Sequence, residues 1–243
     1  MEFWTTFWTA VGSVGGVLVL IVTVYQLIKQ SKRQNELDER QKKIDEREKY
    51  QIELNIKQSL FERRLSNWKI IKSLYLSIEK GMWSTTIVKS SKDFSFFKYI
   101  DLTNNIYLEN IQEALGGMDL SNHEWLTNSL IQNTFLKKMS EMELLSDEIT
   151  LLFSGEESER VSQFIRQYKE NLNNFHKDRI TMNSIREISI ETDEEFDEVA
   201  ERLGLREKQE KVHAEYDLLY KMYKEIKKNN YIDKLYLQIK FTE

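Results

Sequence analysis

The sequence contains no cysteine and no proline, and it has only 8 glycines in 243 residues. Without cysteine, the chain can form no disulfide, no thiolate metal site and no cysteine nucleophile, which excludes disulfide-stapled secreted modules. The lack of proline excludes collagen-like and proline-rich repeats. Because glycine and proline most often interrupt helices, their scarcity predicts long helices.

The N-terminal segment lacks charge, since residues 3–28 contain no Asp, Glu, Lys or Arg. As a helix, residues 7–28 would extend about 33 Å, enough to cross a hydrocarbon core of about 30 Å. Aromatic residues gather at its first end, and Lys29, Lys32 and Arg33 follow its second end. Because positive charge stays on the cytoplasmic side, the pattern predicts a single-pass anchor in the cell membrane over residues 1–28, with the bulk of the chain cytosolic.

Gly12 and Gly16 lie four positions apart within this predicted anchor. This spacing lets two helix backbones approach closely, so it predicts a homodimer through the transmembrane helix. Glycine is also common in transmembrane helices by chance, so a monomeric anchor is the alternative.

Residues 29–80 follow as a segment rich in charge and free of glycine. Opposite charges alternate at helical spacings in its first half, while apolar residues recur at spacings of 3, 4 and 3 from Trp68 to Ile78. We expect a helical stalk or coiled coil that is solvated first and packed later, and that ends at Gly81. Few apolar residues fall at the core positions of a heptad repeat, so a spacer is favoured over a strong coiled coil. The alternative is a basic juxtamembrane cluster that binds anionic lipid headgroups.

Residues 81–243 are predicted to form a cytosolic domain of several helices. Helices are expected over residues 98–115, 121–152, 156–185 and 193–228, after a loop or a pair of short strands over residues 81–97. The start and stop signals that set these limits are the capping pairs Ser121–Glu124 and Thr192–Glu195 and the breakers Gly116, Gly117, Gly155, Asn229 and Asn230.

The C-terminal residues show another pattern, since Leu235, Leu237 and Ile239 alternate with polar or aromatic neighbours. This alternation predicts a short β-strand, for which Ile188 and Ile190 would supply a partner strand. The predicted fold class is therefore all-α, with one N-terminal transmembrane helix, a helical stalk, a multi-helix domain and this short strand.

Signals for catalysis and cofactor binding are scarce. His123, His176 and His213 lack metal-binding spacing, and no glycine-rich phosphate loop occurs. We therefore predict no metal, no cofactor and no catalytic residue. The acidic run over residues 191–201 is interpreted as the first turn of a helix, with a divalent cation site as the alternative.

Arg206 precedes His213 with six residues between them in a helical context. This pair resembles the R-x(4–6)-H signature of HEPN ribonucleases, which are helical and cleave RNA without metal. The resemblance implies His213 as the acid or base and Arg206 as the group that steadies the phosphate. The alternative is a solvated helix face.

Basic and aromatic residues gather in two segments, and together they predict a site for single-stranded RNA or DNA. Lysines contact phosphates, and aromatic rings stack on unpaired bases. The first segment provides Lys221, Lys224, Lys228, Tyr231, Lys234 and Tyr236. The second provides Arg63, Arg64, Lys69 and Lys72 around Trp68, for which packing is the favoured interpretation. The alternative is that the tyrosines pack in the core and the lysines lie on the solvent-exposed side of the helix. The net charge of −5 argues mildly against nucleic acid.

An N-terminal anchor, a charged stalk and a helical, cysteine-free cytosolic domain resemble the membrane-anchored abortive-infection (phage-defence) proteins of bacteria. The resemblance is one of layout and composition. It implies a membrane-held protein that binds single-stranded nucleic acid, preferentially RNA, and disturbs phage replication or transcription timing. Our leading hypothesis is such anchored binding without catalysis. Two alternatives are a membrane-tethered helical scaffold or sensor that binds proteins, and an anchored HEPN-like ribonuclease.

Overall fold

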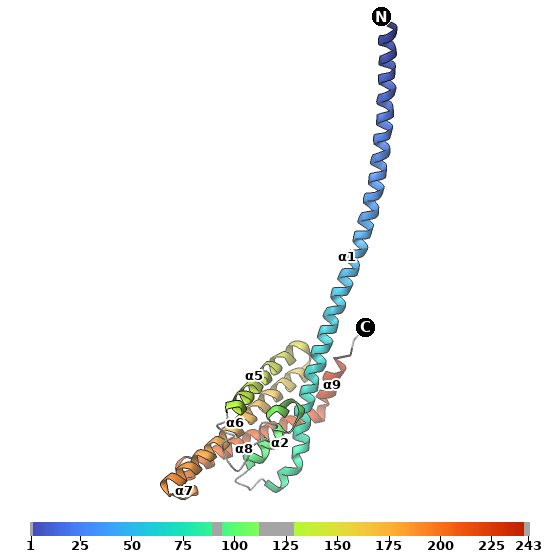
Figure 1. The fold of residues 1–243 in the computed structure, drawn as a ribbon. Helices are drawn as coiled ribbons and strands as arrows, with labels where there is room; N and C mark the ends of the chain where they lie inside the picture. Colours follow the sequence, from blue (N-terminus) through green and yellow to red (C-terminus); the bar gives the residue numbers. More distant parts are fainter. Residues whose placement is uncertain (1, 89–93, 112–128, 241–243) are drawn as a thin grey trace. The chain divides into compact units, whose positions relative to one another are not determined.

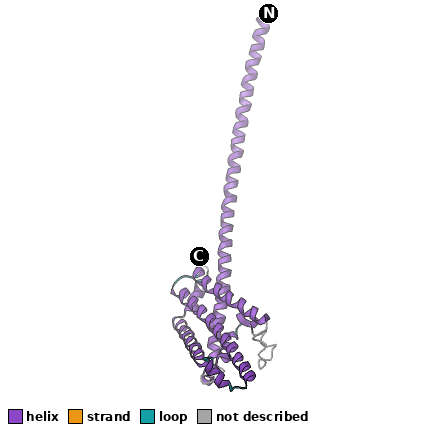
Figure 2. Cartoon of the chain, turned by 90° about the vertical axis from the view of Figure 1, so that its left-hand side faces the viewer, coloured by secondary structure: helices purple, strands orange, loops and turns teal. Residues whose placement is uncertain are grey.

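The computed structural model describes the backbone of residues 2–88, 94–111 and 129–240. The side chains of these residues are described except at 8–15, 17, 18, 20, 82–88, 95 and 96. The chain divides into two compact units, residues 1–59 and residues 60–243. In the described residues every regular element is a helix (Figure 2), which confirms the all-α class.

Helix α1 spans Glu2–Val88, and its residues up to Ser59 make up the first unit. Described side chains there are exposed, and polar pairs four residues apart stabilise the helix locally, such as Gln41 with Asp45 at 2.9 Å and Lys57 with Glu53 at 3.0 Å. Among the residues that can be judged, no helix is long and apolar enough to cross a membrane.

The two glycines of the predicted dimer contact lie in this first unit. Gly12 is among the residues whose side-chain surroundings are not described. A Cβ added at Gly16 would meet nothing within 4 Å, so its small size is not required by packing in the single chain.

The second unit is a helical bundle (Figure 1). Its further elements are α2 (Phe94–Thr103), the 3-10 turn η1 (Ile106–Leu108), α5 (Ser129–Leu152), α6 (Glu156–Thr192), α7 (Phe196–Arg202), α8 (Leu205–Asn229) and α9 (Tyr231–Leu237). Helix α6 lies between α5 and α8 and packs on both. Helix α6 buries an apolar side chain on nearly every turn up to Phe175, because its apolar residues face both neighbouring helices.

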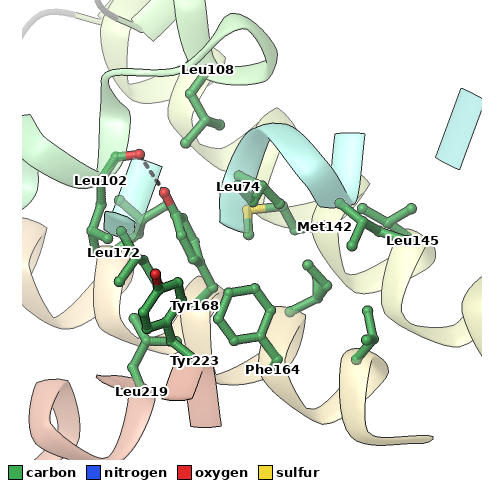
Figure 3. Packing of buried hydrophobic residues seen from close by; sticks show 14 of the residues in the cluster. Leu74, Leu102, Leu108, Met142, Leu145, Phe164, Tyr168, Leu172, Leu219 and Tyr223 are labelled. Carbon is green, nitrogen blue, oxygen red and sulfur yellow. Dashed lines mark hydrogen bonds between the residues drawn. The ribbon is translucent and has the colours of Figure 1, made fainter. Parts of the chain in front are cut away.

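The core joins all these elements except α7. Ile71, Leu74 and Ile78 of α1 are buried in it, so the last part of the predicted stalk helix is packed. Ile56 and Leu60, which were also expected in the packed half, are exposed. Figure 3 shows Leu74 beside Tyr168 and Phe164 of α6. Tyr223 of α8 belongs to the same cluster, so part of the tyrosine stripe is core.

Helix α1 continues beyond Gly81, where the sequence predicted an end, and residues 82–88 are helical rather than loop or strand. A Cβ at position 81 would lie 2.9 Å from Cβ of Asp101. Glycine is therefore needed there for the close approach of α2, and not as a helix stop. The predicted breakers Gly116 and Gly117 and the Ser121–Glu124 cap lie outside the described residues.

The predicted C-terminal strand is wrong, because residues 231–237 form helix α9. Asn230, at φ 53° and ψ 37°, ends α8 in the left-handed conformation and redirects the chain. Tyr231, Ile232 and Leu235 are then buried at helical spacing, while Leu237 is 59% exposed. The proposed partner residues Ile188 and Ile190 lie within α6.

The helix predicted over residues 193–228 is divided in two. Thr192 ends α6 and donates its hydroxyl to the carbonyl of Ile188, so it forms no capping box with Glu195. Gly204, with φ +64°, separates α7 from α8 in a conformation that favours glycine. The ends predicted at Gly155 and at Asn229–Asn230 are confirmed.

Candidate nucleic-acid interface

A groove of about 820 Å³ runs along α1 in the second unit. One wall is an α1 face on which Lys69, Ser73, Leu76 and Lys80 recur every three or four residues. The other wall is the segment 104–110, which contains η1. The lining residues are Trp68, Lys69, Ile70, Lys72, Ser73, Leu76, Ser77, Lys80, Asn104, Asn105, Ile106, Tyr107, Glu109, Asn110 and Lys138.

The second wall exists because α2 stops early. The helix was expected to reach residue 115, but Asn105 takes an extended conformation and its side chain accepts a hydrogen bond of 3.0 Å from the backbone NH of Leu108. Its Nδ2 donates to the carbonyl of Leu102 at 2.7 Å. Such local bonds compete with helix continuation.

Tyr168 fixes this wall to the core. Its hydroxyl donates to the carbonyl of Leu102 at 2.5 Å (Figure 3) and lies 2.6 Å from Oγ of Ser77 on the opposite wall. Burial raises the pKa of Tyr168, so the phenol stays protonated and can serve as that donor. One buried hydroxyl therefore holds both walls of the groove in place.

The groove is positively charged although the chain is not. Its lining contains four lysines and one carboxylate, from Glu109. Nζ of Lys72 lies 4.6 Å from the centroid of the Trp68 ring, and Nζ of Lys138 lies 4.4 Å from that of Tyr107. Lys138 also pairs with Glu141 at 2.7 Å, outside the lining. Two of the four lysines thus lie over the aromatic rings of the lining, Lys72 over Trp68 and Lys138 over Tyr107.

Trp68 connects this groove to the C-terminal helix. Its Nε1 donates to the carbonyl of Ile232 at 3.0 Å, and its ring lies 4.8 Å from that of Tyr236. Lys240 lies 5.9 Å from the Tyr236 ring, which is 41% exposed. The two segments that the sequence singled out therefore meet at Trp68 and Tyr236.

The arginines predicted for the site have partners within the protein. Arg63 pairs with Glu148 at 2.5 Å. Arg64 donates from Nε to the carbonyl of Leu152 at 2.6 Å and from a terminal nitrogen to that of Gln238 at 3.0 Å. Arg64 thereby links the ends of α5 and α9 to α1, which is a structural role.

The predicted residues of α8 and α9 do not form one patch. Lys221 faces outward beside Arg160 and Arg166 of α6 in a separate shallow depression. Nζ of Lys224 lies 4.4 Å from the Tyr220 ring, and Lys228 is exposed. Tyr231 is only 4% exposed and packs in the core, with Lys234 5.2 Å from its ring. None of these residues lines the groove.

Arg206 and His213 have different surroundings. Arg206 is solvent-exposed and pairs with Glu210 at 3.2 Å, whereas the ring of His213 lies 4.1 Å from that of Phe94. Seven positions of helix separate them by about 10 Å along α8. In the part of the chain that can be described, no three acidic or histidine residues are grouped as metal ligands.

Several residues of the groove could not be identified from the sequence. Lys138 sits on a helix whose apolar stripe dominates its pattern, and Tyr107 was assigned to the core of a longer helix. Only the early end of α2 brings Tyr107 and Asn104 opposite α1. A run of two asparagines at 104 and 105 was the available hint, because asparagine favours turns and caps.

No protein family matches the sequence, and no curated protein or solved structure is similar to the chain.

Proposed function

We propose that this protein binds single-stranded nucleic acid in the groove between α1 and the segment 104–110. The observation that carries the proposal is the set of four lysines around Trp68 and Tyr107, in a chain whose net charge is −5. A local excess of positive charge in a concave site attracts phosphates, and the aromatic rings offer faces for bases.

The size of the groove favours a single strand. About 820 Å³ accommodates a few nucleotides, whereas duplex readers present a helix or ribbon that enters a DNA groove. Leu76 and Ile70 add apolar lining near Trp68, which suits unstacked bases better than paired ones. Glu109 at the rim would repel a phosphate and so limit the path of the backbone.

The test is binding of labelled single-stranded RNA and DNA by the full-length chain in discs of uncharged lipid, across a salt series. Replacing Lys69, Lys72 and Lys80 with alanine should weaken binding and lower the log-log salt slope by about 2, since each phosphate contact contributes about 0.7. The matched control replaces three exposed lysines of α8, Lys221, Lys224 and Lys228, which should change the slope little.

The outcomes separate the alternatives. A loss confined to the α8 variant would move the site to that helix, and no binding at low salt would refute nucleic-acid binding and favour a protein scaffold. Cleavage of the RNA that disappears in His213→Ala would establish the ribonuclease instead. Intact RNA after long incubation would support binding without catalysis.

We further propose that residues 7–28 anchor the protein in the cell membrane. The support is the absence of charge over residues 3–28 and the basic residues that follow. Because the chain lacks cysteine, single variants Glu2→Cys and Ser31→Cys can be labelled with an impermeant maleimide in spheroplasts. The proposal requires labelling at position 2 and protection at position 31; the reverse pattern, or protection of both, would refute it.

A role in phage defence follows from the resemblance of layout alone and is the biological setting that we propose. Plating efficiency of phages on cells that express the chain would test it. The Lys69, Lys72 and Lys80 triple variant should lose any protection that depends on the groove. Equal plating with and without the wild-type chain, over a broad set of phages, would contradict the defence role while leaving the binding test intact.

A further inference from the structure

The tip of the second unit has a small core of its own. Ile185, Val199, Ala200 and Leu205 are buried there, with Met182, Ile188 and Phe196 packed around them. Figure 1 shows α7 at this tip, formed with the end of α6 and the start of α8. The cluster is separate from the main core, so it contributes little to holding the bundle together.

A hollow of about 670 Å³ opens at this tip. Met182, Phe196, Ala200 and Leu205 provide apolar lining. Around them stand the carboxylates of Asp197, Glu201, Glu207 and Glu210, with one cation, Arg206. Four carboxylates against one cation give the lining a net charge of −3, and Arg206 is already engaged by Glu210 at 3.2 Å.

The charge extends beyond the hollow. Residues 191–201 contain seven carboxylates and no basic residue, and Arg202, which follows, pairs with Glu194 at 2.9 Å. Asp197 and Glu201 of this run line the hollow, and no metal-binding grouping is found among the residues that the structure describes. Nucleic acid would be repelled here.

A ligand that suits this surface has apolar side chains in the centre and positive charge around them. An amphipathic helix with a leucine-type face flanked by lysine or arginine has this arrangement, and such helices bind in apolar grooves. Complementary charge also speeds association and selects against acidic partners. The hollow lies at α7, whereas the lysine-lined groove lies on α1, so the two surfaces involve different residues.

We propose that the α6–α7–α8 tip is a docking site for a basic amphipathic helix of a partner protein. The partner's apolar face covers the partly exposed Met182 and Phe196, and its cations face Glu201 and Glu207. This site is independent of nucleic-acid binding.

The test uses the full-length chain in discs of uncharged lipid and a peptide probe of about four helical turns, with leucine on one face and lysine on the other. An environment-sensitive dye is attached at Gln209→Cys, which lines the hollow. The control dye is at Ser140→Cys, which is exposed on α5. Nonspecific binding of the peptide to the protein would affect both dyes, whereas docking should change the dye at 209 alone, with saturation.

Charge reversal sharpens the test. The double variant Glu201→Lys, Glu207→Lys should raise the Kd of the peptide about tenfold. The control double variant Glu159→Lys, Asp217→Lys changes exposed positions away from the hollow and should leave the Kd unchanged. A peptide with glutamate in place of lysine should not bind. Circular dichroism establishes that each variant is folded. Equal affinity of the two double variants, equal binding of both peptides, or a response at position 140 equal to that at 209 would overturn the proposal.

Discussion

The indole ring of Trp68 on α1 lies 4.8 Å from the ring of Tyr236 on α9, and its Nε1 donates a 3.0 Å hydrogen bond to the carbonyl of Ile232. The same indole lines the groove and lies beneath Nζ of Lys72. Trp68 therefore combines a structural bond on one side with an aromatic surface on the other, and the two roles can be separated by substitution.

Trp68→Phe keeps a ring and removes the indole NH. We expect the free energy of unfolding to fall by about 1 kcal/mol, because the carbonyl of Ile232 loses its donor. Affinity for single-stranded RNA should change little. Trp68→Leu should lower that affinity about tenfold, since stacking of one base contributes about 1–3 kcal/mol. Urea unfolding and RNA titration measure the two effects, and equal RNA affinity of both variants would contradict a stacking role.

Arg64 and Arg63 are neighbours with different roles, which predicts different costs of removal. Arg64→Ala leaves the carbonyls of Leu152 and Gln238 without their charged donor and should cost about 3 kcal/mol. Arg63→Ala removes an exposed pair with Glu148 and should destabilise the protein much less. Thermal or urea unfolding of both variants checks this difference. Similar losses in the two variants would show that Arg64 does not link the helix ends.

The pH dependence of stability should report on His176. Its ring is stacked on Phe135 with centroids 4.3 Å apart, and its Nε2 lies 3.1 Å from the Gln132 amide. Burial lowers the pKa of His176 from 6.5 to about 4. The unfolded chain therefore takes up a proton first as the pH falls from 6.5 to 4, and stability is lost across that window, by up to about 3 kcal/mol.

The measurement is urea unfolding at several pH values between 7 and 4 for the wild type and for His176→Phe, which preserves an aromatic ring against Phe135. The variant should lack this part of the pH dependence, while the contribution of carboxylates such as Glu79 and Glu148 remains in both proteins. Parallel pH curves for the two proteins would show that the burial of His176 does not control this window.

The fold could be predicted where local chemistry decides it. The ends at Gly155 and Asn230 follow from residues that adopt positive φ readily. The prediction of a C-terminal strand was wrong because, over so short a segment, the spacing of Leu235, Leu237 and Ile239 does not distinguish a strand from a helix. Which period wins depends on the core around Leu235, and that contact comes from distant residues.

The candidate site was predicted in parts. The sequence identified Lys69, Lys72 and Tyr236 as candidates and favoured packing for Trp68, but no local pattern indicates that Trp68 meets Tyr236. Lys221 and Lys224 share a helix face in sequence, yet one faces a depression beside α6 and the other lies over Tyr220. Neither lysine lines the groove on α1, which depends on contacts between distant segments that the spacing along α8 cannot reveal.

Lys98 is a charged residue at the interior of the bundle. Its side chain is fully buried, with Nζ 3.0 Å from a carboxylate oxygen of Asp101 and 5.3 Å from the centroid of the Tyr216 ring. Burial lowers the pKa of Lys98, and the nearby carboxylate of Asp101 opposes that shift. A buried ammonium therefore depends on Asp101 for compensation, whereas Asp101 is partly exposed and can be hydrated.

Because Lys98 is buried and Asp101 is partly exposed, we expect removal of Asp101 to lower the free energy of unfolding more than removal of Lys98. Asp101→Asn removes the carboxylate that lies 3.0 Å from this buried cation and should lower the free energy of unfolding by about 3 kcal/mol. Lys98→Met fills the same space with an apolar side chain and should change stability by less than about 1 kcal/mol. In the double variant, methionine should recover most of the loss, because the amide introduced at position 101 then faces no buried charge. Urea unfolding of the two single variants and the double variant forms a complete cycle, and additive losses would show that the pair is not coupled.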